Sequence, residues 1–238
     1  MPLGAVFVWL STHEKRHEAD PSALEAAYYT GLIMNADEDY ASVPVIDFRN
    51  YRDLVRSGDI HHVVHGFSSR ARLQASNPDS YNHVMWFGGK NDYSEDGQLT
   101  EAFDVMDGWL TAIEEADPQV SAYEAVRAAK PADLQDACFT SGPDGGERLE
   151  QTQIYQGSNE CSALYYPAFA SPRQVAGSPM ANDIAKCALK PLDRSDYNVT
   201  FTSDEWSRLE TVFPEGVCDW TQPGIGQVPS ENWLRYAE

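Results

Sequence analysis

Short apolar runs alternate with amphipathic segments through the first half of the chain. Residues 43–48 and 82–89 are mostly apolar and are bounded by turn-forming residues, which is typical of buried strands. Residues 67–75 can form a helix between them. Residues 100–115 are the clearest helix, because apolar side chains recur there at intervals of three and four: Ala102, Phe103, Met106, Trp109, Leu110 and Ile113. The order strand, helix, strand, helix predicts an α/β fold with a mostly parallel sheet.

Two further helices are indicated by their end signals. Asp20 followed by proline predicts an N-capped helix that stops near Gly31. Towards the end of the chain, Thr202 or Ser203 can cap a helix that has acidic residues in its first turn. Gly216 lies just past the end of that helix, where glycine is favoured.

The character of the chain changes at about residue 130. From there on the sequence is rich in Pro, Gly, Ser and Asp, with little periodicity. We therefore divide it into an α/β part, residues 1–129, and an irregular extension, residues 130–238, that packs on the first part and is not expected to fold independently.

All four cysteines lie in the second half of the chain: Cys138, Cys161, Cys187 and Cys218. None forms a C-x-x-C pair, which argues against a zinc ribbon or a thioredoxin-type site. An even number in loop-rich sequence fits two disulfides and an oxidising compartment, so we expect a secreted or periplasmic protein. Three pairings are open, and sequence order favours Cys138–Cys161 with Cys187–Cys218.

The formal net charge of −20 opposes binding to nucleic acid or to anionic membranes, because both need cationic side chains. The apolar run at the N-terminus is about ten residues long, too short to span a bilayer. It also lacks the basic region of a signal peptide. We therefore expect the chain to be the downstream part of a longer protein.

The segment "PVIDFRNYRD", residues 44–53, resembles the part of α/β-hydrolases in which a late parallel strand delivers the acid of a Ser-Asp-His triad. Pro44, Val45 and Asp53 occupy matching positions, whereas Asn50 stands where that pattern usually has Gly. "HVMWFGG" and the helix that follows it resemble the last strand and C-terminal helix of the same fold. The resemblance implies a partial α/β-hydrolase fold with Asp53 as the catalytic acid.

Other segments extend this resemblance over most of the chain. "GDIHHVVHGFSSRARL", "DIAKCALKPLDRSDY" and "FPEGVCDWTQPGIGQ" resemble the C-terminal part of a family of secreted bacterial proteins near the tannase and feruloyl-esterase type. The resemblance implies a hydrolase that acts on a small or polymeric carboxylic ester and needs no cofactor. No G-x-S-x-G occurs, and "GFSSR" lacks the closing glycine. The nucleophile is therefore expected in a missing N-terminal portion.

The catalytic base is expected among the histidines before the second strand. In the hydrolase pattern the histidine follows the last strand, but "FGGKNDYSEDGQ" contains none, and His83 lies inside the strand. His61 and His65 would share a helix face at i, i+4, and either could act as the base. Two alternatives stay open for these histidines: they cap or line the helix start, or they bind zinc or iron together with Asp59.

A non-catalytic reading is also open. The chain can be a secreted, disulfide-stabilised binding or structural module that keeps part of a hydrolase scaffold. In that case Asp53 caps a turn or pairs with Arg56. We further expect Arg70 and Arg72 to pair with nearby acids on their own helix.

Overall fold

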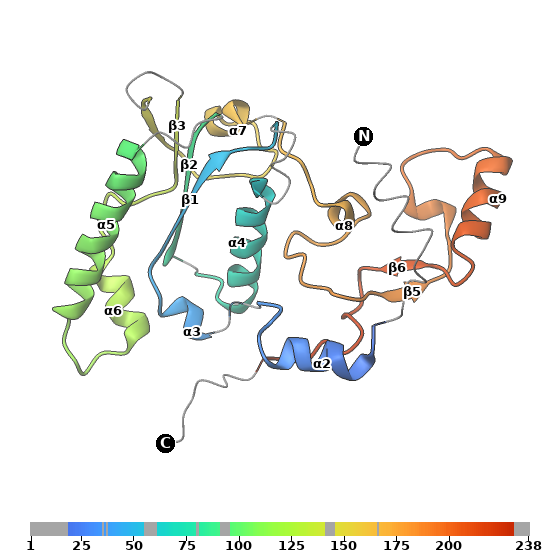
Figure 1. Cartoon of the computed structure of the whole chain (residues 1–238), viewed down its shortest axis with the longest axis horizontal. Coiled ribbons are helices and arrows are strands. Elements are labelled where there is room, and N and C mark those ends of the chain that lie inside the picture. The colour runs from blue at the N-terminus through green and yellow to red at the C-terminus, as the bar shows by residue number, and fades with distance from the viewer. Residues whose placement is uncertain are drawn as a thin grey trace. The chain divides into compact units, whose positions relative to one another are not determined.

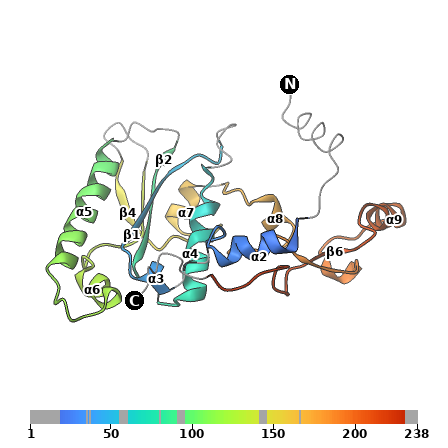
Figure 2. The same cartoon turned by 60° about the horizontal axis from the view of Figure 1, so that its bottom comes forward.

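The computed structural model describes residues 19–34, 36, 38–54, 61–79, 81–90, 96–140, 146–165 and 167–230. Figures 1 and 2 show its helices and strands from two sides. Their bounds are α2 Pro21–Tyr29, α3 Glu38–Ala41, β1 Val45–Tyr51, α4 Val64–Ser76, β2 His83–Lys90, α5 Asp96–Glu114, α6 Ala122–Ala129, β3 Ala137–Phe139, β4 Arg148–Glu150, α7 Glu160–Leu164, α8 Pro172–Val175, β5 Ala188–Lys190, η2 Arg194–Asp196, α9 Ser203–Val212 and β6 Val217–Asp219.

These elements form two compact units. Residues 34–183 make up the first, which we call the sheet unit. The described residues of 1–33 and 184–238 make up the second, which we call the hairpin unit. The predicted boundary at residue 130 falls between α6 and β3, and the sheet unit continues beyond it because β3 and β4 belong to the same sheet as β1 and β2.

The sheet unit contains a four-stranded sheet in the order β1-β2-β3-β4. β1 pairs parallel with β2, starting with Val45 opposite His83, and β2 pairs parallel with β3. Only β4 runs antiparallel, next to β3. Parallel neighbours need a long crossover connection, and α4 lies in the one between β1 and β2. The predicted α/β class and the mostly parallel sheet are confirmed.

Helices cover both faces of this sheet: α5 and α6 lie on one face, and α4 lies on the other (Figure 1). The α5 side has a buried core of Val84, Trp86, Ala102, Trp109, Val126, Leu134, Ala137 and Phe139. The α4 side has a second core of Tyr51, Val63, Phe67, Met85, Phe87, Cys138, Cys161 and Tyr165. Because successive side chains of β2 enter opposite cores, that strand reads as one continuous apolar run.

Gly66 allows α4 to approach the sheet closely. A β-carbon at Gly66 would lie 2.9 Å from Arg49 Nε and 3.0 Å from Asp47 Oδ2. A side chain on this face of α4 would therefore displace an ion pair of β1, in which Arg49 Nε lies 2.6 Å from Asp47 Oδ1. The helix thus packs against charged groups of the strand as well as against its apolar residues.

The hairpin unit is smaller and less regular. β5 and β6 pair antiparallel, and the Cys187–Cys218 disulfide joins the same two segments. The Tyr28 hydroxyl of α2 accepts a hydrogen bond from the Ala185 N–H at 2.7 Å. Thr202, one of the two predicted caps of α9, is the N-cap and forms a capping box: its hydroxyl accepts from the Glu205 N–H, and the Glu205 carboxylate accepts from the Thr202 N–H.

Both expected disulfide pairings are confirmed, Cys138–Cys161 and Cys187–Cys218. Disulfides of this kind fit a protein of an oxidising compartment. Within the described ranges, no helix is both long enough and apolar enough to cross a membrane.

Removing the Cys138–Cys161 disulfide should destabilise the sheet unit. Both sulfur-bearing residues are buried, and the bond closes a loop with a sequence separation of 23. Loop-closure entropy predicts that Cys138→Ala combined with Cys161→Ala lowers the free energy of unfolding by about 3 kcal/mol. Urea unfolding followed by tryptophan fluorescence measures this. An unchanged midpoint, with the loss of the bond verified by mass spectrometry, would contradict the prediction.

Candidate functional site

Asp53 lies just beyond the carboxyl end of β1, and it is only 4 % exposed. Its Oδ1 accepts a hydrogen bond from the Val63 N–H at 2.9 Å, and its Oδ2 accepts one from the Phe169 N–H at 2.8 Å. The buried carboxylate therefore joins three segments: the end of β1, the start of α4 and the chain before α8. Charge-assisted bonds to backbone N–H groups are among the strong hydrogen bonds of proteins.

Two tyrosines lie within the electrostatic reach of Asp53. Burial raises the pKa of Tyr51 to about 12, and the negative charge of Asp53 adds to the effect. Burial and the same charge also raise the pKa of Tyr155. The Tyr51 hydroxyl therefore stays protonated at neutral pH, and it donates to the Pro167 carbonyl at 2.6 Å. It holds the same loop that Asp53 binds through Phe169.

Residues 61–65, which we call the histidine turn, lead into α4 and include its first residues. His61 is exposed, whereas His65 lies half-buried on the first turn of the helix. The hydrogen bond from Val63 to Asp53 ties this turn to the end of β1. Among the described residues, no hydrogen bond or ion pair joins Asp53 to His61 or His65.

The alternative metal site of Asp59, His61 and His65 can be assessed only in part, because Asp59 lies outside the described residues. Among the residues that are described, no group of three His, Cys, Asp or Glu side chains is placed to hold a metal ion.

A polar cleft opens beside the histidine turn, with a volume of about 420 Å³. Most of the lining comes from β1 and the residue after it: Asp47, Phe48, Arg49 and Asn50 of β1, and Arg52. His61 and Leu99 complete it. His61 is therefore the candidate base that faces an open cleft. Asp53 is not part of this lining.

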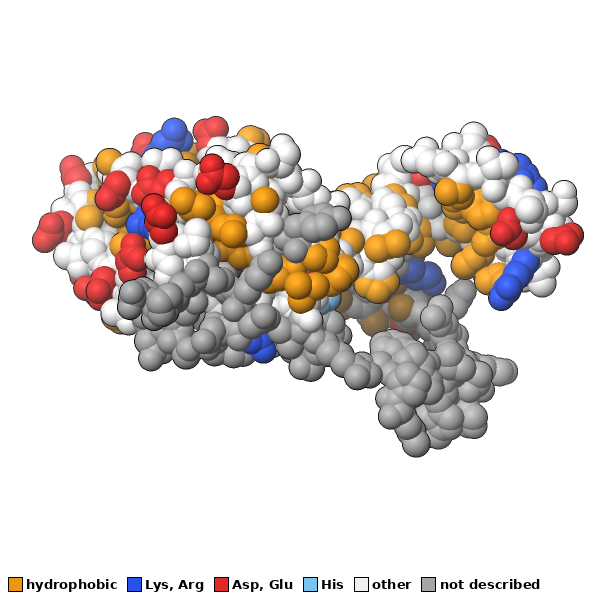
Figure 3. Space-filling model, turned by 90° about the horizontal axis from the view of Figure 1, so that it is seen from above, with side chains coloured by type: hydrophobic (Ala, Val, Ile, Leu, Met, Phe, Trp, Pro, Cys, Tyr) orange, Lys and Arg blue, Asp and Glu red, His pale blue; other side chains and the backbone are white. Residues whose placement is uncertain are grey.

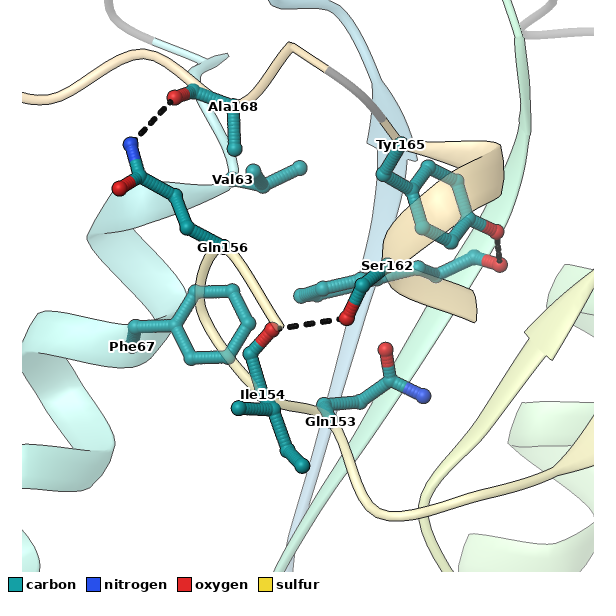
Figure 4. Close-up of a pocket in the computed structure, with 9 residues that line it drawn as sticks. Val63, Phe67, Gln153, Ile154, Gln156, Ser162, Tyr165 and Ala168 are labelled. Atoms are coloured by element: carbon teal, nitrogen blue, oxygen red, sulfur yellow. Dashed lines mark hydrogen bonds between the residues drawn. The ribbon is translucent and has the colours of Figure 1, made fainter. Parts of the chain in front are cut away.

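On the other side of the turn is a small, mostly apolar cavity (Figure 4). Its volume of about 20 Å³ is enough for one water molecule and for no substrate. Phe67 of α4 faces Ile154, and Ser162 donates from its hydroxyl to the Ile154 carbonyl at 3.0 Å. Tyr165 closes the cavity on the sheet side and donates to the Phe87 carbonyl. These contacts make this region part of the core.

A buried charge network crosses the sheet unit. Arg70 of α4 binds both carboxylate oxygens of Asp136, and Arg70 Nη2 lies 2.7 Å from Asp136 Oδ1. Arg70 Nε donates to His83 Nδ1 at 3.1 Å, which places the His83 proton on Nε2. That nitrogen lies 3.7 Å from Asp47 Oδ2. The chain Asp47, His83, Arg70, Asp136 thus links β1, β2, α4 and the start of β3.

Both aspartates of this network stay ionised. Burial acts to raise the pKa of Asp136, but the Arg70 guanidinium and the N–H groups of Met85 and Gln153 outweigh burial and hold the pKa below its ordinary value. At Asp47, burial is likewise outweighed by the nearby His83 and Arg49, so that its pKa is also lowered. His83 is buried and the three charged residues are largely buried and paired, which is typical of a structural role.

The expectation that Arg70 and Arg72 pair with acids on their own helix is wrong. Arg70 binds Asp136 from a distant part of the chain, and Arg72 donates to three backbone carbonyls, those of Met34, Ala181 and Asn182. A signal for the network was present in the sequence, because Asp47 follows the apolar run that begins β1 and His83 begins the apolar run of β2. Their partners lie too far along the chain for spacing to identify them.

The sequence of residues 3–229 matches a family described as tannase-like and of unknown function (DUF6351). The chain belongs to this family. The match confirms the predicted resemblance to the tannase type, and it covers Asp53, the histidine turn and both disulfides. Tannase-like membership is consistent with an esterase-type hydrolase scaffold. No curated protein and no solved structure matches the chain.

Replacing Arg70 should strongly destabilise this tannase-like chain. Arg70→Met keeps the bulk of the side chain but leaves the buried Asp136 without its counter-charge. We expect the free energy of unfolding at pH 7 to fall by about 3–5 kcal/mol. Urea unfolding measures the change.

The pH dependence of the free energy of unfolding provides a second test of the role of Arg70. In the parent protein, the lowered pKa of Asp136 contributes stability above the unfolded pKa of about 4, and this contribution is lost as pH falls through the folded pKa. The difference in free energy of unfolding between Arg70→Met and the parent protein should therefore become smaller below about pH 4. Arg127→Met is the matched control, because Arg127 is exposed and pairs with Asp79 at 3.5 Å; we expect a much smaller change in the free energy of unfolding than for Arg70→Met. Equal effects of the two substitutions would contradict a special role for Arg70.

Proposed function

We propose that this chain carries the acid and the base of a secreted or periplasmic serine hydrolase that acts on carboxylic esters. The observation that supports the proposal is the placement of Asp53. It is a buried carboxylate just beyond the carboxyl end of a parallel strand, the place where open α/β sheets present their functional groups. It is also bonded to the turn between His61 and His65.

The proposed chemistry follows from the groups that this turn offers. A serine hydroxyl is a weak nucleophile at neutral pH, so an imidazole must take its proton as the acyl group is attacked. His61 or His65 would supply that imidazole, and His61 has the more open position in the cleft. The Asp53 carboxylate would orient the imidazole and stabilise its protonated form.

Asp53 contacts neither histidine directly, and the proposal includes a step that forms this contact. Hydrogen bonds of catalytic groups are often long or absent without substrate and tighten in the reacting complex. Each Asp53 oxygen accepts one backbone N–H and keeps a second lone pair for an imidazole. A change of side-chain rotamer at His61 or His65 would therefore leave the existing bonds of the carboxylate in place.

The nucleophile is proposed to come from a hydrolase portion outside these 238 residues, since their sequence contains no G-x-S-x-G. The substrate would be a small or polymeric ester. Neither the acid nor the base requires a metal or an organic cofactor for this reaction.

A second candidate function is supported by the same carboxylate. Both Asp53 oxygens are occupied by backbone N–H groups that hold α4 and the loop before α8 in place. This is also what a purely structural aspartate does. The alternative is a secreted, non-catalytic binding or structural module on a hydrolase-derived scaffold.

Substitution of the proposed acid and base tests the ester hydrolase. In the protein purified as its gene encodes it, Asp53→Asn should lower kcat/KM for p-nitrophenyl acetate by about 10⁴-fold, because the imidazole loses its orienting carboxylate. The alanine substitution of the true base, His61 or His65, should lower kcat/KM by at least about 1,000-fold. Initial rates of p-nitrophenolate release measure both effects.

His62→Ala is the matched control, since this imidazole lies in the same turn and its ring packs 5.8 Å from the ring of Phe169. It should leave turnover little changed. Asp53→Asn is also expected to lower the free energy of unfolding by about 1.5–3 kcal/mol, so each variant needs a thermal melt. Full turnover in folded Asp53→Asn, His61→Ala and His65→Ala proteins would overturn the hydrolase assignment in favour of the non-catalytic module.

A further inference from the structure

The polar cleft beside β1 carries a surplus of positive charge. Among its described lining residues, Arg49 and Arg52 are cationic and only Asp47 is anionic. His61 adds a further positive charge when it is protonated. The whole chain, in contrast, has a formal net charge of −20, and Figure 3 shows mostly acidic charged side chains where Figure 1 places α5. A local surplus of positive charge on so acidic a protein favours an anionic group in the cleft.

Asp47 does not cancel this charge, because it is already paired. Its Oδ1 lies 2.6 Å from Arg49 Nε, and its Oδ2 lies 3.7 Å from His83 Nε2. The side chain of Asp47 is 12 % exposed and that of Arg49 is 27 % exposed, so the guanidinium side of the pair is the more accessible one. The ion pair uses Nε, which is one of the five N–H donors of a guanidinium. Arg49 is therefore held in place by Asp47 and can still bind a second carboxylate.

The same cleft has an apolar side. It follows the outer edge of β1, the first strand in the sheet order, and successive side chains of a strand point to opposite faces. Phe48 therefore lies on the α5 side, where it packs on the buried core, and Arg49 lies on the α4 side. Leu99 borders the cleft and begins an apolar stripe on α5 that continues with the exposed Phe103 and Leu110. A ligand with one anionic part and one apolar part matches this lining.

We propose that the substrate is an ester that also carries a carboxylate, which Arg49 and Arg52 bind. Phe48 and Leu99 contact an apolar part of the same molecule. This inference rests on the proposed hydrolase function and names the substrate class of that site. His61 lines the same cleft, so a carboxylate held by the arginines keeps the ester beside the candidate base. The volume of about 420 Å³ lies in the size range of sites for small ligands.

An uncharged ester fits the cleft less well. Any ligand that fills the cleft removes water from the guanidinium groups of Arg49 and Arg52. Covering a charged group without a compensating partner costs free energy, whereas a carboxylate on the ligand offsets that cost. The planar guanidinium also matches the geometry of a carboxylate, with two parallel N–H···O bonds.

Two esters with acyl chains of equal length test the proposal in the protein purified as its gene encodes it. The mono-p-nitrophenyl ester of adipic acid ends in a carboxylate, where p-nitrophenyl hexanoate ends in a methyl group. We expect kcat/KM for the adipate ester to exceed that for the hexanoate ester by at least about tenfold, the effect of one charge-assisted hydrogen bond. Equal values, or a preference for the hexanoate ester, would overturn the carboxylate site.

Substitution of the arginines shows whether they cause the preference. Arg52→Met should lower the ratio of the two kcat/KM values by at least about fivefold, and Arg52→Lys should restore part of it, because the charge is kept. Arg49→Met should lower the ratio as well; it leaves Asp47 without its partner, so circular dichroism must show that this variant is folded. Arg127→Met is the matched control, because Arg127 is exposed on α6 outside the cleft and should leave the ratio unchanged. A preference that survives in both Arg49→Met and Arg52→Met would overturn the proposal.

Binding of adipate itself separates this inference from the proposed function, because it requires no turnover. Titration with adipate should shift the backbone NMR signals of Arg49, Asn50 and Arg52, with an apparent Kd at least about fivefold weaker in Arg52→Met; hexane-1,6-diol, the uncharged analogue, should not shift them. Binding of adipate without turnover of either ester would support the carboxylate site and overturn the hydrolase. Turnover of both esters at equal kcat/KM, without binding of adipate, would do the reverse.

Discussion

The sheet unit depends on the ion pair between Arg70 and Asp136. β3 begins only at Ala137, so the Met85 N–H, which faces that side of β2, has no strand carbonyl opposite it. The Asp136 carboxylate accepts this N–H at 2.9 Å and the Gln153 N–H at 3.0 Å, and thereby connects the sheet with the chain beyond β4. The Arg70 guanidinium of α4 offsets the desolvation of this carboxylate. The position of the helix, the short third strand and the following loop are therefore coupled through one carboxylate.

At the other end of the sheet, the Asp53 carboxylate likewise accepts backbone N–H groups from two segments. It accepts N–H groups from the start of α4 and from the loop before α8, where no regular secondary structure could satisfy them. Unlike Asp136, it has no arginine partner among its described contacts, and its charge raises the pKa of Tyr51. In the proposed function, the Asp53 carboxylate would stabilise an imidazolium of the neighbouring turn. The same bonds satisfy a structural role completely, which is why activity and stability must be measured separately.

The surface of the sheet unit agrees with its sheet order. Both faces of β1 and β2 are covered by helices, yet the outer edge of β1 borders a cleft and an apolar helix stripe. In a protein with so strong a negative charge, acidic side chains serve solubility over most of the surface, and a stripe of large apolar residues stands out against them.

The sequence by itself determined the α/β class and the main helices and strands of the first half, because periodicity and capping residues are local signals. It favoured the two disulfide pairs that formed but left three pairings open. It also singled out Asp53, and tannase-like membership agrees with the resemblance that suggested this residue. Only the tertiary structure decided which distant residues contact one another. Arg70 meets Asp136 across 66 positions, and Asp53 meets Phe169 across 116 positions. No spacing rule reaches that far, since such pairs depend on how helices and loops pack on the finished sheet. For the same reason, the structure and not the sequence placed Asp53 against backbone N–H groups and left His61 in the open cleft.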